Sequence, residues 1–134
     1  MKVLVFCGSY DKRILSEAMA FGRIYWSDSS LREMLRQISA ADAIFVNSGH
    51  VDIEMLEDSP HLKAIICPEK ILRSMEISSI SALGVAILQM PEAESYSAEW
   101  TKLFEKLWKL YLGHPIFPVL NPDVYHHPDW IRMK

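Results

Sequence analysis

The chain has 134 residues, of which half are hydrophobic and 23% are charged, and its net charge is -3. This length suits one globular domain with a substantial core and is short for two. Acidic and basic residues are interspersed, so a nucleic-acid partner is disfavoured. No apolar run approaches the roughly 20 residues of a membrane span. The start of the sequence does not resemble a signal peptide and is expected to be a strand.

Short apolar runs alternate with helical patterns over the first 89 residues. The runs predicted as buried strands are KVLVFC (2–7), RIYW (23–26), AIFVN (43–47), HLKAIIC (61–67) and VAILQ (85–89). Apolar residues at helical spacing predict helices within 11–22, 27–42, 52–58 and 75–84. Gly22 and Gly84 are expected to end the first and last of these, and Asp52 to cap the third. This alternation predicts a five-stranded parallel sheet in a flavodoxin-like, three-layer α/β sandwich.

The pattern changes after Gln89. SAEWTKLFEKLWKLYLG (97–113) predicts a long amphipathic helix that ends at Gly113, and its aromatic stripe is typical of a core or a protein interface. Four prolines exclude a regular helix over 114–130. We therefore expect a single domain over 1–134, with a βα core (1–92), a helix (93–113) and a packed tail (114–134). The predicted stripe is Trp100, Leu103, Phe104, Leu107, Trp108 and Tyr111, and the packing residues of the tail are Phe117, Val119, Leu120, Tyr125 and Trp130.

Ligands of open α/β sheets bind beyond the carboxyl ends of the strands, near the point where the strand order reverses. The loops CGSYDK, NSGHVD and CPEK, after the first, third and fourth strands, are therefore candidates. GSYD could cradle an anion through its backbone N–H groups, but a turn and a helix cap are the expected interpretation. In the second loop, Gly49 permits positive φ and outward N–H groups, which suit a carboxylate. An ordinary turn with Ser48 as a local cap fits equally well, and the residues alone leave both interpretations open.

Several other kinds of site are disfavoured by spacing. The five glycines form no GxG pair, so neither a dinucleotide fingerprint nor a P-loop is present. Cys7 and Cys67 lack any metal or redox spacing and are expected to be buried thiols of a cytoplasmic protein. His126 and His127 have no third ligand nearby, so no metal site is predicted.

Single titratable residues add little further evidence for a functional site. His50, taken alone, is expected to be a surface histidine that could still titrate or donate to a ligand. Glu69, Glu92 and Glu94 lie near the expected crevice, but nothing in the sequence pairs them for acid–base chemistry.

From Ala41 to Trp100 the chain resembles the substrate-binding domain of D-isomer-specific 2-hydroxyacid dehydrogenases. ADAIFVNSGHVDIEMLEDSPHLKAI (41–65) and SALGVAILQMPEAESYSAEW (81–100) follow the order and spacing of the family's motifs, with one deletion before Ser97. LGHPIFPVLNPDVYHHPDW (112–130) resembles the segment with which these enzymes return to that domain.

The resemblance also implies what this chain lacks. In the family, an NAD-binding domain that carries the catalytic arginine, glutamate and histidine is inserted before the returning segment. This chain has no such insert, so no catalytic residue is carried over. No cofactor is expected either, unless a separate chain supplies an NAD domain.

On the substrate side, the resemblance implies that Ser48, Gly49 and His50 hold a carboxylate. The candidate residues for lining the pocket are Asn47, Pro68, Glu69 and Lys70. The family's glycine-rich loop is replaced by CPEKILRS (67–74), and a family glycine is replaced by Glu92, so the pocket is expected to be narrowed or repurposed.

Three hypotheses follow. The first is a stand-alone, non-catalytic domain (a pseudoenzyme) that binds a small carboxylate or a protein partner. The second is the substrate-binding half of a split NAD-dependent dehydrogenase, completed by another chain through the aromatic helix at 97–112. The third is a truncated or designed chain without native activity. The first expects the aromatic helix to be mostly covered by the tail, and the second expects a large exposed apolar patch.

Overall fold

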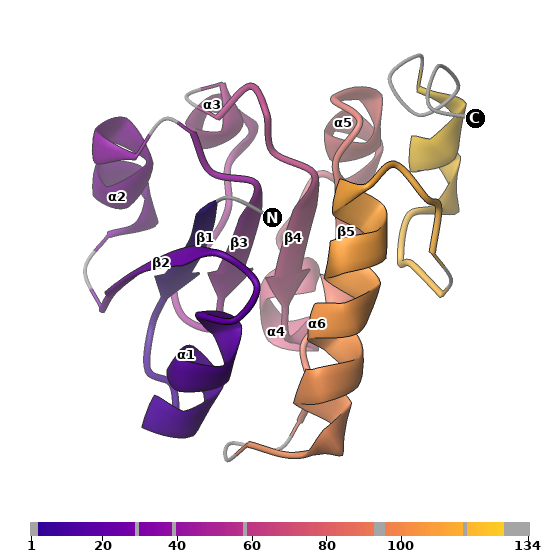
Figure 1. The fold of residues 1–134 in the computed structure, drawn as a ribbon. Helices are drawn as coiled ribbons and strands as arrows, with labels where there is room; N and C mark the ends of the chain where they lie inside the picture. The colour runs from indigo at the N-terminus through magenta and orange to yellow at the C-terminus, as the bar shows by residue number, and fades with distance from the viewer. Residues whose placement is uncertain are drawn as a thin grey trace.

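The computed structural model describes residues 3–28, 30–38, 40–57, 59–92, 96–116 and 118–127. Its strands form one parallel sheet in the order β2-β1-β3-β4-β5 (Figure 1). The predicted five-stranded, flavodoxin-like sheet is therefore confirmed, and the strand order reverses between β1 and β3. The strands are β1 (Val3–Cys7), β2 (Arg23–Ser27), β3 (Ala43–Val46), β4 (Ala64–Cys67) and β5 (Ala86–Gln89).

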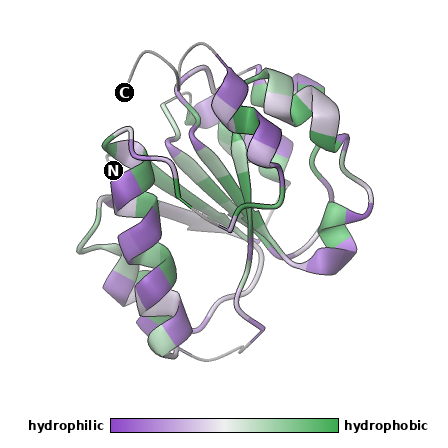
Figure 2. Cartoon of the chain, turned by 90° about the vertical axis from the view of Figure 1, so that its right-hand side faces the viewer, coloured by the Kyte–Doolittle hydropathy of each residue, from purple (hydrophilic) through white to green (hydrophobic). Residues whose placement is uncertain are grey.

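Helices cover both faces of the sheet. One face packs against α1, α6 and the tail, and the other packs against α2, α3, α4 and α5 (Figures 1 and 2). Each of β3 and β4 is buried along its whole length, which explains why these strands appear in the sequence as continuous apolar runs. The helices are α1 (Lys12–Ala18), α2 (Leu31–Gln37), α3 (Ile53–Leu56), α4 (Glu69–Leu72), α5 (Ile77–Ala82), α6 (Ala98–Tyr111) and the 3-10 helix η1 (Pro122–His126).

The core on the α6 side is aromatic. The rings of Phe6 and Phe45 stack with centroids 4.2 Å apart, and Trp100 and Phe104 of α6 lie 6.2 and 6.0 Å from Phe45. All four side chains are almost completely buried. Aromatic side chains of this size each remove a large apolar area from water, so α6 is held to the sheet by the chain's own core.

Two predictions about helices were wrong. α1 ends at Ala18 and not at Gly22, because the chain turns so that Phe21 packs against Phe104, with ring centroids 5.5 Å apart. The segment after β4, interpreted from the sequence as a loop, contains α4, whose Ile71 is buried in the core. In both places a tertiary contact overrides the local signal.

The buried face of α6 is rotated slightly from the predicted stripe. Trp100, Leu103, Phe104 and Leu107 are buried as predicted, but Leu110 completes the buried face. Trp108 is 42% exposed and Tyr111 is half-buried, and the two rings stack at the margin with centroids 6.1 Å apart. Most of the aromatic face of α6 therefore lies inside the chain.

The tail lies along the outer edge of β5. The Leu120 N–H donates to the Ile87 carbonyl at 2.8 Å, and the buried Asn121 accepts from the Ile87 N–H through Oδ1 at 2.7 Å. Asn121 Nδ2 donates to the Val85 carbonyl at 2.8 Å and to Ser81 Oγ at 3.0 Å. The amide of Asn121 thus takes the place of a further strand.

The packing predicted for the tail is correct in part. Val119 and Tyr125 are buried, whereas Leu120 is 37% exposed, because its backbone rather than its side chain faces β5. Phe117 and Trp130 lie outside the described residues. Both cysteines are buried and unbridged, as predicted. No described helix is long and apolar enough to cross a membrane.

Candidate functional site

A crevice of about 1090 Å³ lies at the carboxyl ends of the strands, where the strand order reverses. The loops after β1, β3, β4 and β5 form its walls, and Ile14 and Trp100 line it from the helical layer below. This is the position at which open α/β sheets bind ligands. Its lining comprises Gly8, Ser9, Tyr10, Asp11, Ile14, Asp28, Asn47, Ser48, Pro68, Glu69, Lys70, Gln89, Met90, Pro91, Glu92 and Trp100.

The loop after β1 is fixed by hydrogen bonds. Gly8 donates through its N–H to Ser27 at 3.0 Å and accepts through its carbonyl from Trp26 Nε1 at 2.8 Å. Asn47, from the loop after β3, accepts from the Ser9 N–H at 3.2 Å and donates through Nδ2 to the Ser9 carbonyl. The N–H groups of Gly8 and Ser9 are therefore used internally, and this loop is no anion cradle.

Close packing makes a glycine necessary at position 8. Gly8 has φ of +119°, and a Cβ there would lie 1.7 Å from Asn47 Oδ1. The sequence suggested a turn and a cap in this loop. The structure shows the cap at Asp11, whose carboxylate accepts from the Arg13 N–H at 3.0 Å and from the Tyr96 N–H at 3.2 Å. These two bonds lower the pKa of Asp11.

The turn after β3 is different. Gly49 has φ of +83°, and the space around its Cα is open. Within the described residues, the N–H groups of Ser48, Gly49 and His50 have no hydrogen-bond acceptor. Ser48 does not cap α3 either, since the residue at the N-cap position is Asp52 and it makes no capping bond. The turn therefore presents N–H groups to solvent at the rim of the crevice.

The side chain of His50 pairs with Asp52 and is not part of the crevice lining. Its Nε2 lies 3.2 Å from Asp52 Oδ2, and the same oxygen lies 3.5 Å from an Arg32 guanidinium nitrogen on α2. This pairing is why Asp52 does not cap α3 through its side chain. Ser48 lines the crevice, but Gly49 and His50 are outside its lining. The structure therefore separates the side chain of His50 from the other predicted binding residues.

Carboxylates predominate among the charged groups of the crevice. Glu69 and Lys70 line it, and Asp11, Asp28 and Glu92 add three further carboxylates. Glu69 is partly neutralised by Arg73, whose nitrogen lies 3.3 Å from Oε1. Pro68 and Asn47 also line the crevice, whereas Glu94 lies outside the described residues.

Sequence reasoning missed the aromatic part of the lining. Tyr10 donates through its hydroxyl to the Cys7 carbonyl at 3.2 Å and packs edge-on against Trp100, with centroids 6.4 Å apart. Burial raises the pKa of Tyr10. Asp28 was also missed, because it comes from the end of β2 and only the sheet order brings it near β1. In the part of the chain that the structure describes, no group of side chains could hold a metal ion.

Comparison with known proteins gives a likeness in structure only. No family model and no curated protein matches the sequence. The NADPH-dependent glyoxylate/hydroxypyruvate reductase of Sinorhizobium meliloti, in complex with citrate, matches with a TM-score of 0.55 at 13% identity over 69% of this chain. The chain has the fold of a D-2-hydroxyacid dehydrogenase domain.

Two further structures support the dehydrogenase-like fold. The same reductase in complex with NADP and malonate gives a TM-score of 0.54 at 13% identity over 68% of this chain. A protein from Ralstonia solanacearum assigned as a D-3-phosphoglycerate dehydrogenase gives 0.51 at 10% identity over 69%. This chain spans only 28 to 31% of the length of these proteins. The shared property is therefore the fold.

Proposed function

We propose that the chain is a non-catalytic binding domain of dehydrogenase-like fold, which holds a small carboxylate at the Ser48–His50 turn. The observation that supports this most is the set of three N–H groups without acceptors, beside a glycine in the left-handed region, at the point of strand reversal.

The charges of the crevice narrow the class of ligand. Asp11, Asp28, Glu69 and Glu92 would repel a second negative group and attract a positive one, with Lys70 as the cation in the lining. A ligand that points its carboxylate at the turn and an ammonium group into the crevice would satisfy both. We therefore expect a 2-amino acid to bind more tightly than the 2-hydroxy or 2-oxo acid of the same carbon skeleton.

The residues present also support a role without hydride transfer. A general acid or base must lie within hydrogen-bond reach of the reacting group. Carboxylates and Lys70 in the lining could exchange a proton, but among the described residues the lining has no histidine or arginine, which the family resemblance places beside a carboxylate in the dehydrogenases. The nearby His50 is paired with Asp52. The burial of most of the apolar face of α6 favours this proposal over a split enzyme, which needs that face as an interface.

The test is an amide NMR titration with alanine, lactate and pyruvate, followed by NADH. We expect saturable shifts centred on Ser48, Gly49 and His50, with alanine binding most tightly at about millimolar affinity. NADH should cause none.

Gly49→Ala is the diagnostic variant, because it strains a left-handed turn without a steric clash. Gly113→Ala controls for the backbone strain, since Gly113 has a similar φ of +91° at the end of α6 and is outside the crevice lining, although it is buried and Gly49 is exposed. Loss of binding in the first variant alone supports the proposal. Absence of saturable shifts with all three acids, or unchanged binding in Gly49→Ala, would overturn it.

A further inference from the structure

Only some of the outward backbone groups of β5 are hydrogen-bonded. β5 is at the edge of the sheet, and the N–H groups of Ala86 and Met90 donate inwards, to Lys63 next to β4 and to Cys67 at the end of β4. Because backbone groups alternate in direction along a parallel strand, those of Ile87 and Gln89 point outwards. The tail occupies both outward groups of Ile87.

The outward groups of Gln89 are different. Neither its N–H nor its carbonyl has a hydrogen-bond partner in the part of the chain that the structure describes. Gln89 is also the exposed residue of β5, whose other residues are buried. An edge residue with an unpaired donor and acceptor can form two hydrogen bonds with an extended chain.

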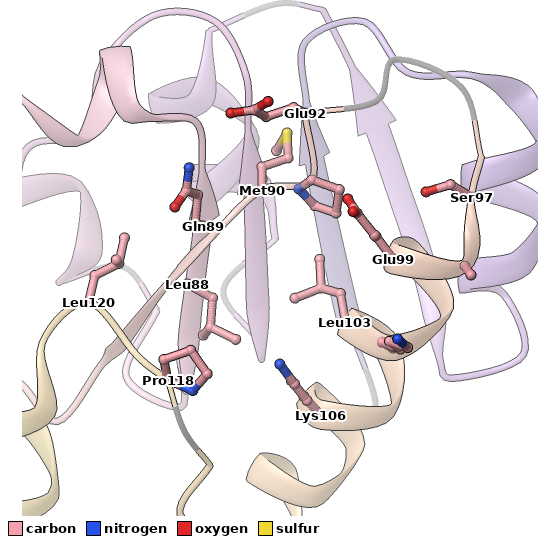
Figure 3. Close-up of a pocket in the computed structure, with 13 residues that line it drawn as sticks. Leu88, Gln89, Met90, Glu92, Ser97, Glu99, Leu103, Lys106, Pro118 and Leu120 are labelled. Atoms are coloured by element: carbon pink, nitrogen blue, oxygen red, sulfur yellow. The ribbon is translucent and has the colours of Figure 1, made fainter.

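A groove of about 760 Å³ runs beside this edge, between β5, α6 and the tail (Figure 3). Leu88 and Leu103 give it an apolar side, and Pro118 and Leu120 of the tail bound it. Figure 3 shows the side chains of Leu88 and Leu103 turned towards the space between the strand and the helix. The groove thus offers an apolar contact next to the unpaired backbone of Gln89.

Opposite charges lie at the two ends of the groove. Glu92 and Glu99 lie where β5 ends and α6 begins, whereas Lys106 lies further along α6, beside Pro118 (Figure 3). Lys102, one turn before Lys106, also lines the groove. None of these four groups has an ion-pair partner within the described residues. Such a distribution selects an occupant with complementary charges at its two ends.

We propose that this groove binds an extended segment of another protein, which adds to the edge of β5 at Gln89. The segment carries a basic residue at the Glu92–Glu99 end, an acidic residue at the Lys102–Lys106 end and an apolar side chain between them. Strand addition of this kind takes affinity from main-chain hydrogen bonds and specificity from side chains.

A second copy of the chain does not fit the same place. If two β5 strands paired antiparallel about Gln89, Pro91 of each would lie opposite Ile87 of the other. The outer side of Ile87 is already occupied by Leu120 and Asn121. The β5 of a second copy is held in its own sheet and cannot avoid this obstacle, whereas a free peptide can pair at Gln89 and then leave the edge along the groove.

The test uses fluorescein-labelled hexapeptides and anisotropy. The mixed peptide Lys-Val-Thr-Val-Thr-Glu should bind saturably. Lys102→Glu combined with Lys106→Glu should weaken it roughly 5-fold, since each exposed ion pair contributes little. The peptide Lys-Val-Thr-Val-Thr-Lys should bind this double variant better than it binds the wild type. A structural defect would weaken both peptides, so this rescue identifies the charges.

Gln89→Pro tests the backbone. It removes the outward N–H and leaves the bonds to β4 in place, so the mixed peptide should bind roughly 5-fold more weakly. Gln89→Ala keeps the N–H and should bind as the wild type does, with thermal unfolding confirming that both variants fold. The proposal is overturned if the wild type binds no peptide at millimolar concentration, if Gln89→Ala weakens binding as much as Gln89→Pro, or if the charge rescue is absent.

Discussion

Two asparagine side chains each bind backbone groups of a distant segment, one at the crevice and one at the edge of the sheet. Asn47 uses both ends of its amide to join the loop after β3 to Ser9 in the loop after β1. Asn121 uses both ends to join the tail to Ile87 and Val85 at β5. The geometry is similar, but Asn121 is 3% exposed and Asn47 is half-buried at the rim of a crevice.

The difference in burial determines what each side chain contributes. When an exposed hydrogen bond is removed, water replaces the lost partner, whereas a buried backbone group is left unpaired at the full desolvation cost. Asn121 is therefore expected to be a determinant of stability. Asn47 is expected mainly to set the shape of the crevice.

The largest expected effect is that of Asn121→Ala. It leaves the Ile87 N–H and the Val85 carbonyl without their partner and should lower the free energy of unfolding by about 4 kcal/mol. Urea denaturation followed by circular dichroism measures this. A loss no larger than that of Asn47→Ala would show that burial does not distinguish the two asparagines.

Gly8→Ala should cost about 3 kcal/mol, because it adds a steric clash with Asn47 Oδ1 to the strain of a positive φ. In the Asn47→Ala background the clash partner is absent, so only the conformational strain remains and the cost should fall to about 1–2 kcal/mol. A double-mutant cycle in urea gives both values. Strict additivity would show that the two residues do not constrain each other in solution.

The pH dependence of stability tests a residue that neither asparagine side chain contacts. Burial raises the pKa of Cys67 from 9.0 to about 11, so the folded chain holds this thiol proton more tightly than the unfolded chain does. The associated stability is complete below about pH 9 and is lost as the pH rises towards 11, by roughly 2 kcal/mol.

Urea denaturation between pH 8 and 11 measures this loss. We expect the same loss in the wild type and in Asn47→Ala, and a smaller one in Cys67→Ala. A changed pH profile in Asn47→Ala would show that its contact with Ser9 also affects the environment of Cys67 in β4.

The smallest expected effect is that of Asn47→Ala itself, at about 1 kcal/mol. Its clearer consequence is local. The substitution keeps the bond from the backbone N–H of residue 47 to the Cys7 carbonyl but releases Ser9, whose loop directly follows Cys7 at the end of β1. Thiol labelling under native conditions should therefore become faster at Cys7 and stay unchanged at Cys67. Equal acceleration at both cysteines would indicate global destabilisation.

The fold could be predicted because its signals are local and repeated. Strands buried on both faces appear as continuous apolar runs, and the helices between them show helical periodicity. α4 was missed because Ile71 is its one fully buried anchor in a four-residue helix. The buried face of α6 was predicted to include Trp108 rather than Leu110. Both residues are apolar, and only packing determines which of them is buried.

Of the candidate site, only the backbone conformation could be predicted. The positive φ of Gly49 follows from the residue type and its place after a strand, and the structure shows it. Contacts across the fold could not be predicted: Asn47 binds Ser9, and Asp28 reaches the crevice from β2. Each depends on which strands are neighbours, and the sequence of one chain records this weakly.

The attachment of the tail to β5 has a consequence for synthesis of the protein. Translation delivers β5 before Asn121, so the nascent sheet has a longer bare edge than the finished one. An uncovered edge strand pairs readily with other chains. The interval before the tail leaves the ribosome is therefore when this protein is most prone to aggregate, and faster translation of that last segment should raise its soluble yield.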